Sequence, residues 1–411
     1  MKIFYLLWLK ISSYTRRTPL AWLQLSHQRI RLIVAILGVA FSIILIFTQL
    51  GIRAMLFDGV TLLPEHLNGD LYLLSSYSEN IRNSSFASIY LYQADAIEGV
   101  ASAVPLYVEM GEWVDPKLLE SSEETKEPAD AELPKSSRIQ MLAFNPTKPV
   151  FKIPEINQQL DLLAVPGGIL YDRLAKSELG NIPQLFASES QVSSIMSNHR
   201  VTVVGLFSLG STFYDEGRAV MSDWSFGQMQ GLETLDRVTV GVLALEPEAD
   251  PQTVIKRIQD NLSKDIKVLT PEELVRGEQA YVAQWPEGKV LNFGAAIGFI
   301  VGIVVVYQVI YTDVSEHLPE YATLKAMGYQ DRDLSLVVLQ ESLILALMGF
   351  IPGYLASHGV YYLLATFVEL PVSMKTAITL QVFMLNVVMC VLAGAIAVRK
   401  LRTADPADIF Y

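Results

Sequence analysis

The stretch LIVAILGVAFSIILIFTQLGI, residues 32–52, contains no charged side chain. An α-helix rises about 1.5 Å per residue, so this stretch is long enough to cross a hydrocarbon layer about 30 Å thick. A helix buried in the core of a soluble protein usually carries a shorter apolar run of roughly 10–14 residues. Three further runs, 290–312, 342–368 and 376–398, are also uncharged. The sequence therefore predicts four transmembrane helices.

The composition of the 411-residue chain also indicates a membrane protein, with an acidic segment between the first two runs. Hydrophobic residues make up 51% of the chain and charged residues 18%. Residues 53–289 carry 19 Lys and Arg against 34 Asp and Glu, a balance of −15 that argues against nucleic-acid binding. The single cysteine, Cys390, lies inside the fourth run, which excludes a disulfide within the chain.

Basic residues beside the predicted spans indicate the orientation of the chain. Residues 1–31 contain six Lys and Arg and no acidic residue, and residues 399–402 contain three more basic residues. Lys and Arg in short segments next to a span mark its cytoplasmic side. We therefore expect both termini in the cytoplasm and the chain in the inner (cytoplasmic) membrane. Apolar and polar positions alternate within 1–31, which predicts an amphipathic segment on the lipid surface.

These features predict the fold class: an α-helical membrane protein with four transmembrane helices and an α+β extracytoplasmic (periplasmic) domain inserted between the first and second. We expect the spans at 32–52, 290–312, 334–356 and 376–398, and the α+β domain at 53–289. The remaining segments are the N-terminal segment 1–31, a cytoplasmic loop at 313–333, a short periplasmic segment at 357–375 and a cytoplasmic tail at 399–411.

Short segments rich in β-branched and aromatic residues predict strands within 53–289. They are Asp70–Ser75, Val104–Val114, Arg138–Phe144, Arg200–Phe207 and Val238–Leu245. A helix is predicted over Asp250–Leu262, with Asp250 as its N-cap, and residues near Leu274 are expected to begin the helix that leads into the second span. Residues 115–137 are rich in Glu, Pro, Ser and Lys and are expected to form a mobile acidic insertion.

Small residues and one acid stand out in the predicted spans. Gly294, Gly298 and Gly302 recur every four residues, which predicts close packing against another helix, within the chain or across a dimer. Glu341 and Ser342 lie near the start of the third span. An acid at this point is a functional candidate if it lies deep in the membrane. An interfacial position, reached by snorkelling, explains Glu341 equally well.

No catalytic motif is recognisable in the sequence. It contains no Walker A motif, no His-Glu-x-x-His and no Gly-x-Ser-x-Gly, and its five histidines lack metal-ligand spacing. We therefore expect no enzyme activity, no cofactor and no metal site in this chain. Any work that it performs is expected to draw on energy from a partner.

The most distinctive local motif is EHLPEYATLKAMGY, residues 316–329. It predicts a short cytoplasmic helix over Glu320–Met327, after Pro319 and before Gly328. One side of this helix would carry Tyr321, Leu324 and Met327. A short helix tied to spans at both ends suits the transfer of movement from a docked partner into the membrane, and an ordinary amphipathic connector is the alternative. The residues expected to couple the chain to such a partner are Glu320, Tyr321, Leu324, Lys325, Met327 and Gly328.

The loop motif, with the Glu-Ser pair that follows it, resembles the permeases of the MacB/FtsX-like (type VII, mechanotransmission) ABC transporter superfamily. The matching positions are Glu320, Leu324, Lys325, Ala326, Met327, Gly328, Glu341 and Ser342. The tail around Asp405 and Pro406 resembles the C-terminal signature of that superfamily. PLAWLQL at 19–25 and LLPEHLNGDL at 62–71 resemble the DevC group of cyanobacterial permeases.

The resemblance implies the permease subunit of a tripartite exporter. Two copies would pair, each with a separate DevA-like ABC ATPase that binds ATP and Mg²⁺. The periplasmic domain would engage a DevB-like membrane-fusion adaptor and a TolC-like outer-membrane channel, and the cargo would be a glycolipid-like or other substrate. The alternative is an FtsX-like regulator of a periplasmic cell-wall hydrolase, without transport. A sensory receptor fits less well, because no signalling module follows the second span.

Overall fold

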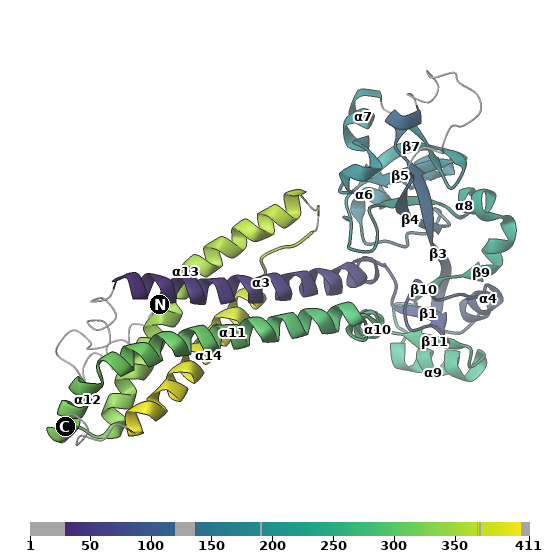
Figure 1. Cartoon of the computed structure of the whole chain (residues 1–411). Helices are drawn as coiled ribbons and strands as arrows, with labels where there is room; N and C mark the ends of the chain where they lie inside the picture. Colours follow the sequence, from purple (N-terminus) through teal and green to yellow (C-terminus); the bar gives the residue numbers. More distant parts are fainter. Residues whose placement is uncertain (1–28, 120–135, 190, 368, 370, 404–411) are drawn as a thin grey trace. The chain divides into compact units, whose positions relative to one another are not determined.

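The computed structural model describes residues 29–119, 136–189, 191–367, 369 and 371–403 (Figure 1). The amphipathic segment predicted within 1–31, apart from its last three residues, most of the insertion predicted at 115–137 and the end of the tail lie outside the described residues. The chain divides into a helical unit and an α+β domain. The helical unit contains the chain up to Ala54 and most of the chain from Lys289 on, and the α+β domain contains Met55–Gly288.

Four long helices pass through the helical unit. They are α3 (Arg29–Glu65), α11 (Pro286–Glu316), α13 (Asp331–Phe367) and α14 (Thr376–Thr403). Each is long and apolar enough to cross a membrane, so four transmembrane helices with an α+β domain between the first and second are confirmed. With 37 residues each, α3 and α13 exceed the roughly 20 residues that a bilayer requires. A helix satisfies its own backbone hydrogen bonds in lipid and in water, and can therefore continue past its apolar run.

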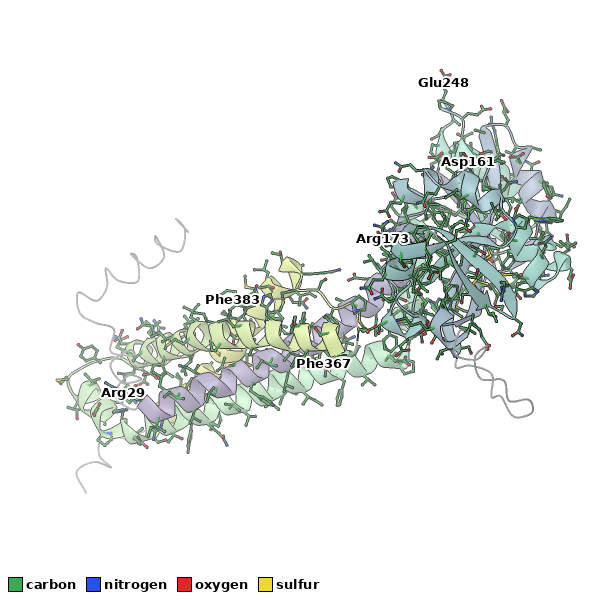
Figure 2. All side chains as sticks on the ribbon, turned by 90° about the horizontal axis from the view of Figure 1, so that it is seen from above. Arg29, Asp161, Arg173, Glu248, Phe367 and Phe383 are labelled. Carbon is green, nitrogen blue, oxygen red and sulfur yellow. The ribbon has the colours of Figure 1, made fainter. Side chains whose placement is uncertain are left out.

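Polar side chains bind neighbouring helices of this bundle together. Tyr361 Oη on α13 donates to Phe47 O on α3 (2.6 Å), and Asn386 Nδ2 on α14 donates to Ala346 O on α13 (2.8 Å). Both side chains are buried, where an unpaired donor would be costly. Apolar side chains such as Phe367, which is 77% exposed, lie on the outer surface of the unit (Figure 2). This surface is suited to contact with lipid chains.

The α+β domain is built on a nine-stranded sheet. Its strands are β1 (Leu71–Ser75), β3 (Val100–Val114), β4 (Ser136–Phe144), β5 (Gly168–Asp172), β6 (Val192–Met196), β7 (His199–Phe207), β8 (Arg218–Ser222), β10 (Val240–Leu245) and β11 (Ile266–Leu269). Their order is β11-β1-β10-β3-β4-β8-β5-β7-β6, and the end of β3 also pairs with β6. This extra pairing closes six strands, from β3 round to β6, into a ring. The pairs β4–β8 and β5–β7 are parallel and the other pairs are antiparallel.

The predicted strand segments lie in strands except at Asp70 and Thr239, and the boundaries differ by up to four residues. Val238 belongs to a separate two-stranded sheet, formed by β2 (Phe86–Ala87) and β9 (Arg237–Val238). Thr239 separates β9 from β10, and its Oγ1 accepts a hydrogen bond from Val108 N (3.1 Å). β4 begins at Ser136, inside the segment predicted as a mobile insertion, because its pairing with β3 continues that far.

Helices pack on both faces of the sheet. One buried apolar cluster joins the sheet to α4 (Ile89–Asp95), α7 (Ile182–Glu189), α8 (Asp223–Gln230) and α9 (Pro251–Asn261). A second cluster joins it to the end of α3, to α6 (Pro154–Asn157) and to α10 (Pro271–Ala283). Short 3₁₀ helices cover Leu160–Ala164, Ser177–Leu179 and Leu232–Asp236. The end of α3 and the helix α10, which adjoin the first and second membrane spans in sequence, therefore pack in the same cluster against the sheet.

The helix expected near Leu274 differs from the prediction. It is α10, which starts at a capping box between Thr270 and Glu273 and ends at Ala283, while α11 begins separately at Pro286. Proline lacks the backbone N–H that an uninterrupted helix would need at this point and its ring disfavours a helical residue before it. The chain therefore enters the second span through a break between two helices.

α9 begins at the predicted cap, and this supports a small, local prediction. The Asp250 side chain accepts from Thr253 N (2.9 Å). Asp250→Ala should destabilise the first turn by about 1 kcal/mol. Hydrogen exchange of the Thr253 amide in the full chain should then be about fivefold faster. Asp260→Ala, at the exposed end of the same helix, is the control, and an equal effect of both changes would contradict the capping role.

Candidate functional site

The predicted coupling helix is α12 (Leu318–Ala326), between α11 and α13. It begins two residues earlier than predicted, because Pro319 lies in its first turn and does not precede it. Proline is well tolerated there, since the first backbone N–H groups of a helix have no partner within the helix. The helix ends at Ala326, and the chain turns at Gly328. The φ of Gly328, +99°, lies in the left-handed region that glycine enters readily.

Two ion pairs and a contact between a histidine ring and a carboxylate hold this segment to its neighbours. They join Arg31 to Glu316 (2.5 and 2.7 Å), His317 Nδ1 to Glu320 (3.1 Å) and Lys325 to Asp331 (2.9 Å). The first pair links the beginning of α3 to the end of α11, and the third links α12 to the beginning of α13. Exposed pairs of this kind contribute about 1 kcal/mol or less to stability, so their main effect is to fix position.

The two sides of α12 have different surroundings. Tyr321 is 2% exposed and packs in the bundle core, and Leu324 is partly buried against the same core. Met327 is 65% exposed. The prediction that these three share one side is therefore wrong, because α12 ends at Ala326 and Met327 already belongs to the turn at Gly328. The exposed residues of the segment include Glu320, Met327 and Tyr329, here called the α12 tip.

The three glycines of α11 lie against helices of the same chain. A Cβ atom at Gly294 would lie 2.7 Å from Gln49 Cδ, one at Gly298 would lie 3.3 Å from Ile46 Cγ1, and one at Gly302 would lie 3.1 Å from Ser42 Cβ and collide with Met389 Sδ. Three of these neighbours belong to α3 and the fourth, Met389, to α14. The absence of side chains thus allows close helix contact within one chain. A role for these glycines across a dimer stays a prediction.

Glu341 is fully buried in the helical unit. Neither of its carboxylate oxygens has a hydrogen-bond partner among the described residues. The side chain is therefore enclosed by protein, and its depth in the membrane stays a prediction. Asp313 on α11 is also buried, at 3% exposed. The adjacent Ser342 donates to Val338 O (2.9 Å). Buried acids are rare in membrane helices and usually mark a functional position.

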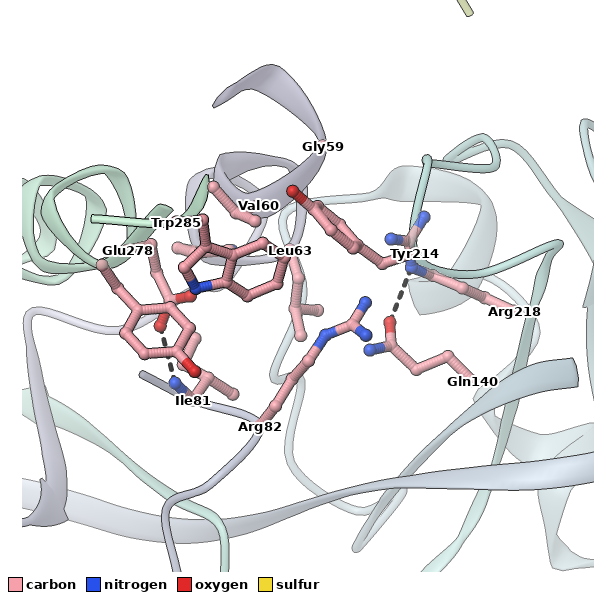
Figure 3. A pocket seen from close by; sticks show the side chains of 12 residues that line it. Gly59, Val60, Leu63, Ile81, Arg82, Gln140, Tyr214, Arg218, Glu278 and Trp285 are labelled. Atoms are coloured by element: carbon pink, nitrogen blue, oxygen red, sulfur yellow. Dashed lines mark hydrogen bonds between the residues drawn. The ribbon is translucent and has the colours of Figure 1, made fainter. Parts of the chain in front are cut away.

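The α+β domain contains a pocket that was not predicted from the sequence (Figure 3). Its walls are the end of α3, the loop between β1 and β2, strands β4 and β8, and α10. Aromatic rings in edge-to-face contact line one side, with 5.1 Å between the ring centres of Tyr214 and Trp285 and 5.4 Å between those of Tyr281 and Trp285. The pocket lies entirely within the α+β domain, where segments far apart in sequence meet.

Two arginines share one carboxylate beside this pocket. Arg218 is 1% exposed, and it donates to Gln140 Oε1 (2.8 Å) and to Asp215 Oδ2 (3.1 Å). Arg82 donates to the same Asp215 oxygen (3.0 Å). Burial lowers the pKa of Arg218, and the negative charge of Asp215 opposes that shift. The sequence signal for this site is an arginine directly before the apolar Ala-Val-Met of β8, because a buried charge requires a partner.

Comparison with known proteins connects the helical unit to a family. Residues 292–406 match the FtsX-like permease C-terminal family, a match that contains α12, Glu341 and most of three spans. Two curated proteins of Mycobacterium tuberculosis, from strains CDC 1551 / Oshkosh and ATCC 25618 / H37Rv, are each described as an uncharacterized ABC transporter permease. Each is 25% identical over 120 residues, which is 29% of this chain. The match spans 33% of the length of each relative.

Two solved structures are similar to the α+β domain. The periplasmic region of MacB from Actinobacillus actinomycetemcomitans aligns with a TM-score of 0.33 and 10% identity, over 52% of this chain and 92% of that chain. The extracellular domain of the noncanonic ABC-type transporter YknZ from Gram-positive bacteria aligns with a TM-score of 0.31 and 11% identity, over 49% of this chain and 100% of that chain.

Proposed function

We propose that this chain is the membrane-spanning permease subunit of an ABC transporter, and that a separate ATPase drives it. The match of residues 292–406 to the FtsX-like permease C-terminal family supports this proposal, as do the two relatives described as ABC transporter permeases. The chain itself is proposed to be without enzyme activity, because its sequence offers no nucleotide-binding motif. ATP and Mg²⁺ would be bound by the partner.

The two-sided setting of α12 carries the proposal. The exposed tip, Glu320, Met327 and Tyr329, offers a surface for the ATPase. The opposite side, with Tyr321, is fixed in the bundle core, so that displacement of the tip would move the ends of α11 and α13 together. Tyr321 and Leu324 would thus act by anchoring the helix and not by touching the partner.

The finer proposal is an exporter of the DevC type. Both termini and α12 would lie in the cytoplasm, and the α+β domain would lie in the periplasm of a cyanobacterial cell. Two copies would pair, and their α+β domains would engage a membrane-fusion adaptor and a TolC-like channel to drive a glycolipid-like or other substrate outwards. The segments 19–25 and 62–71, which resemble the DevC group, support this choice. The motion would pass through the helices mechanically.

Substitution at the α12 tip tests the proposal. Met327→Asp places a charge in the centre of the proposed docking surface, and we expect it to reduce co-purification of the ATPase from detergent-solubilised membranes at least about tenfold. Leu174→Asp makes the same kind of change at an exposed apolar residue of the α+β domain and serves as the control. The bound ATPase would be identified by mass spectrometry through its Walker motifs. Equal recovery of an ATPase with Met327→Asp and with the unchanged chain would remove α12 as the docking site.

A further inference from the structure

A buried carboxylate joins α10 to the loop that lies between β1 and β2. Glu278 on α10 is 6% exposed, and its Oε1 accepts a hydrogen bond from the backbone N–H of Ile81 at 2.6 Å (Figure 3). Ile81 belongs to the segment 76–85, here called the 76–85 loop. Both residues line the pocket of the α+β domain. The two segments are 197 residues apart in sequence, and this hydrogen bond holds them together at one wall of the pocket.

The basic groups nearest to Glu278 already bind other oxygen atoms. Arg82, on the 76–85 loop, donates to Asp215 Oδ2 (3.0 Å), and its guanidinium lies 5.3 Å from the centre of the Tyr214 ring. Lys267, on β11, donates to Ser78 O (2.5 Å). No ion pair of Glu278 is found among the described residues. Its charge therefore has one backbone N–H and two cations at a distance to stabilise it.

The other elements around the pocket do not neutralise Glu278. β8 contributes Arg218, which is bound to Asp215 and Gln140. The end of α3 contributes only Gly59, Val60, Leu63 and Pro64 to the wall, none of which is charged. A carboxylate that loses its water without gaining an ion pair favours its neutral form. Burial accordingly raises the pKa of Glu278 to about 7, although the Ile81 N–H, Arg82 and Lys267 act in the opposite direction.

We propose that Glu278 is a proton-operated latch, which fastens α10 to the 76–85 loop when it binds a proton and loosens when it releases one. The direction of the pH effect follows from the linkage between proton binding and closure of the pocket. A closed pocket buries the carboxyl group and an open pocket exposes it to water, so the closed state binds the proton more tightly and proton uptake must favour closure. This inference goes beyond the proposed function and holds whether or not the chain is a transporter subunit.

The latch lies close in sequence to the start of the second span. α10 ends at Ala283 and α11 begins at Pro286. The pH around the α+β domain would therefore adjust how firmly this domain holds the chain just before the second span. At lower pH the junction would be tight, and at higher pH the 76–85 loop and α10 would separate more often.

Hydrogen exchange of the full chain in detergent micelles tests the latch. Closed-state pKa near 7 and the ordinary value of 4.5 for an open state imply that closure is about tenfold more favourable at pH 6 than at pH 8. After correction for the intrinsic pH dependence of exchange, peptides covering the 76–85 loop should therefore exchange about tenfold more slowly at pH 6. A corrected rate that is the same at both pH values would overturn the proposal.

Three variants separate the latch from other titrating groups. Glu278→Gln keeps the acceptor for Ile81 N but is always neutral, so the loop should be protected at both pH values. Glu272→Gln removes a charge from the exposed side of the same helix and should leave the pH dependence unchanged. Persistence of the pH dependence in Glu278→Gln would assign it to another group and reject the latch.

A third variant supplies a readout that a purely structural role would not move. Lys267→Gln retains a donor for Ser78 O but removes a cation that favours ionised Glu278. The midpoint of the exchange transition should then move to higher pH. A midpoint that stays in place or moves to lower pH would contradict the proposed electrostatics, even if Glu278→Gln proved too unstable to purify.

Discussion

Arg218→Met is expected to unfold the α+β domain at markedly lower denaturant concentrations than the unchanged chain. The arginine is 1% exposed and donates to Gln140, to Asp215 and to the carbonyl oxygen of Gly210. Methionine fills most of the same volume but leaves the Asp215 carboxylate, which is fully buried, without its buried cationic partner. Breaking a buried ion pair in this way costs about 3–5 kcal/mol. The loss would be measured as a shift in the urea midpoint for proteolysis of the α+β domain in the full chain.

Arg82→Met provides a matched control for this prediction. Arg82 contacts the same oxygen of Asp215 at 3.0 Å, but its side chain is 34% exposed, so water can replace much of its contribution. We expect a loss of about 1 kcal/mol or less. If Arg82→Met proved as damaging as Arg218→Met, burial would not be what makes the Asp215–Arg218 pair important.

Gly349→Leu is expected to prevent normal packing of the helical unit. A Cβ atom at Gly349 on α13 would lie 2.6 Å from Val39 Cβ on α3, closer than non-bonded carbon atoms approach. A leucine side chain would force the two helices apart, at a cost of about 1–3 kcal/mol or more. The measurement is the fraction of monodisperse protein that survives heating in detergent, followed by size-exclusion chromatography.

Gly359→Leu is the control on the same helix. Among the residues that the structure describes, no atom beyond the immediate chain neighbours and the backbone of its own helix lies within 4 Å of a Cβ built at Gly359, and the residue is exposed. A leucine at this position should therefore leave the heat resistance of the protein nearly unchanged. Equal losses at Gly349 and Gly359 would mean that added bulk in α13 is harmful wherever it is placed, and would contradict a specific contact with α3.

The membrane architecture could be predicted because it depends on one physical length, the thickness of the bilayer. A run such as 32–52 has to match the thickness of a bilayer, and few other structures require about 20 uncharged residues in succession. Strands of the α+β domain were predicted where β-branched residues are dense, as in β7. β5 and β8, with five buried residues each, were missed, although β1, which is equally short and buried, was predicted from its composition. Such short strands do not alternate between apolar and polar residues, and periodicity cannot detect them.

The candidate sites show a sharper limit of sequence reasoning. α12 was foreseen because Pro319 and Gly328 mark its ends, yet the direction in which Met327 points depends on where the last turn stops. Glu341 was recognised as an acid near the start of a span, but its complete burial depends on the packing of neighbouring helices around it. Glu278 and Ile81 are 197 residues apart in sequence, and no local sequence pattern predicts a contact over such a separation.

The position of α3 in the bundle limits how the sequence of this protein can drift. Gly298 of α11 and Gly349 of α13 both lie against α3, at Ile46 and Val39, and Tyr361 of α13 binds the Phe47 carbonyl. A larger side chain on any of these surfaces has to be matched by a smaller one on its neighbour. α3, α11 and α13 are therefore expected to vary in concert among descendants of one ancestor. An α3 taken alone from a distant relative would lack the side chains that fit against these glycines of α11 and α13.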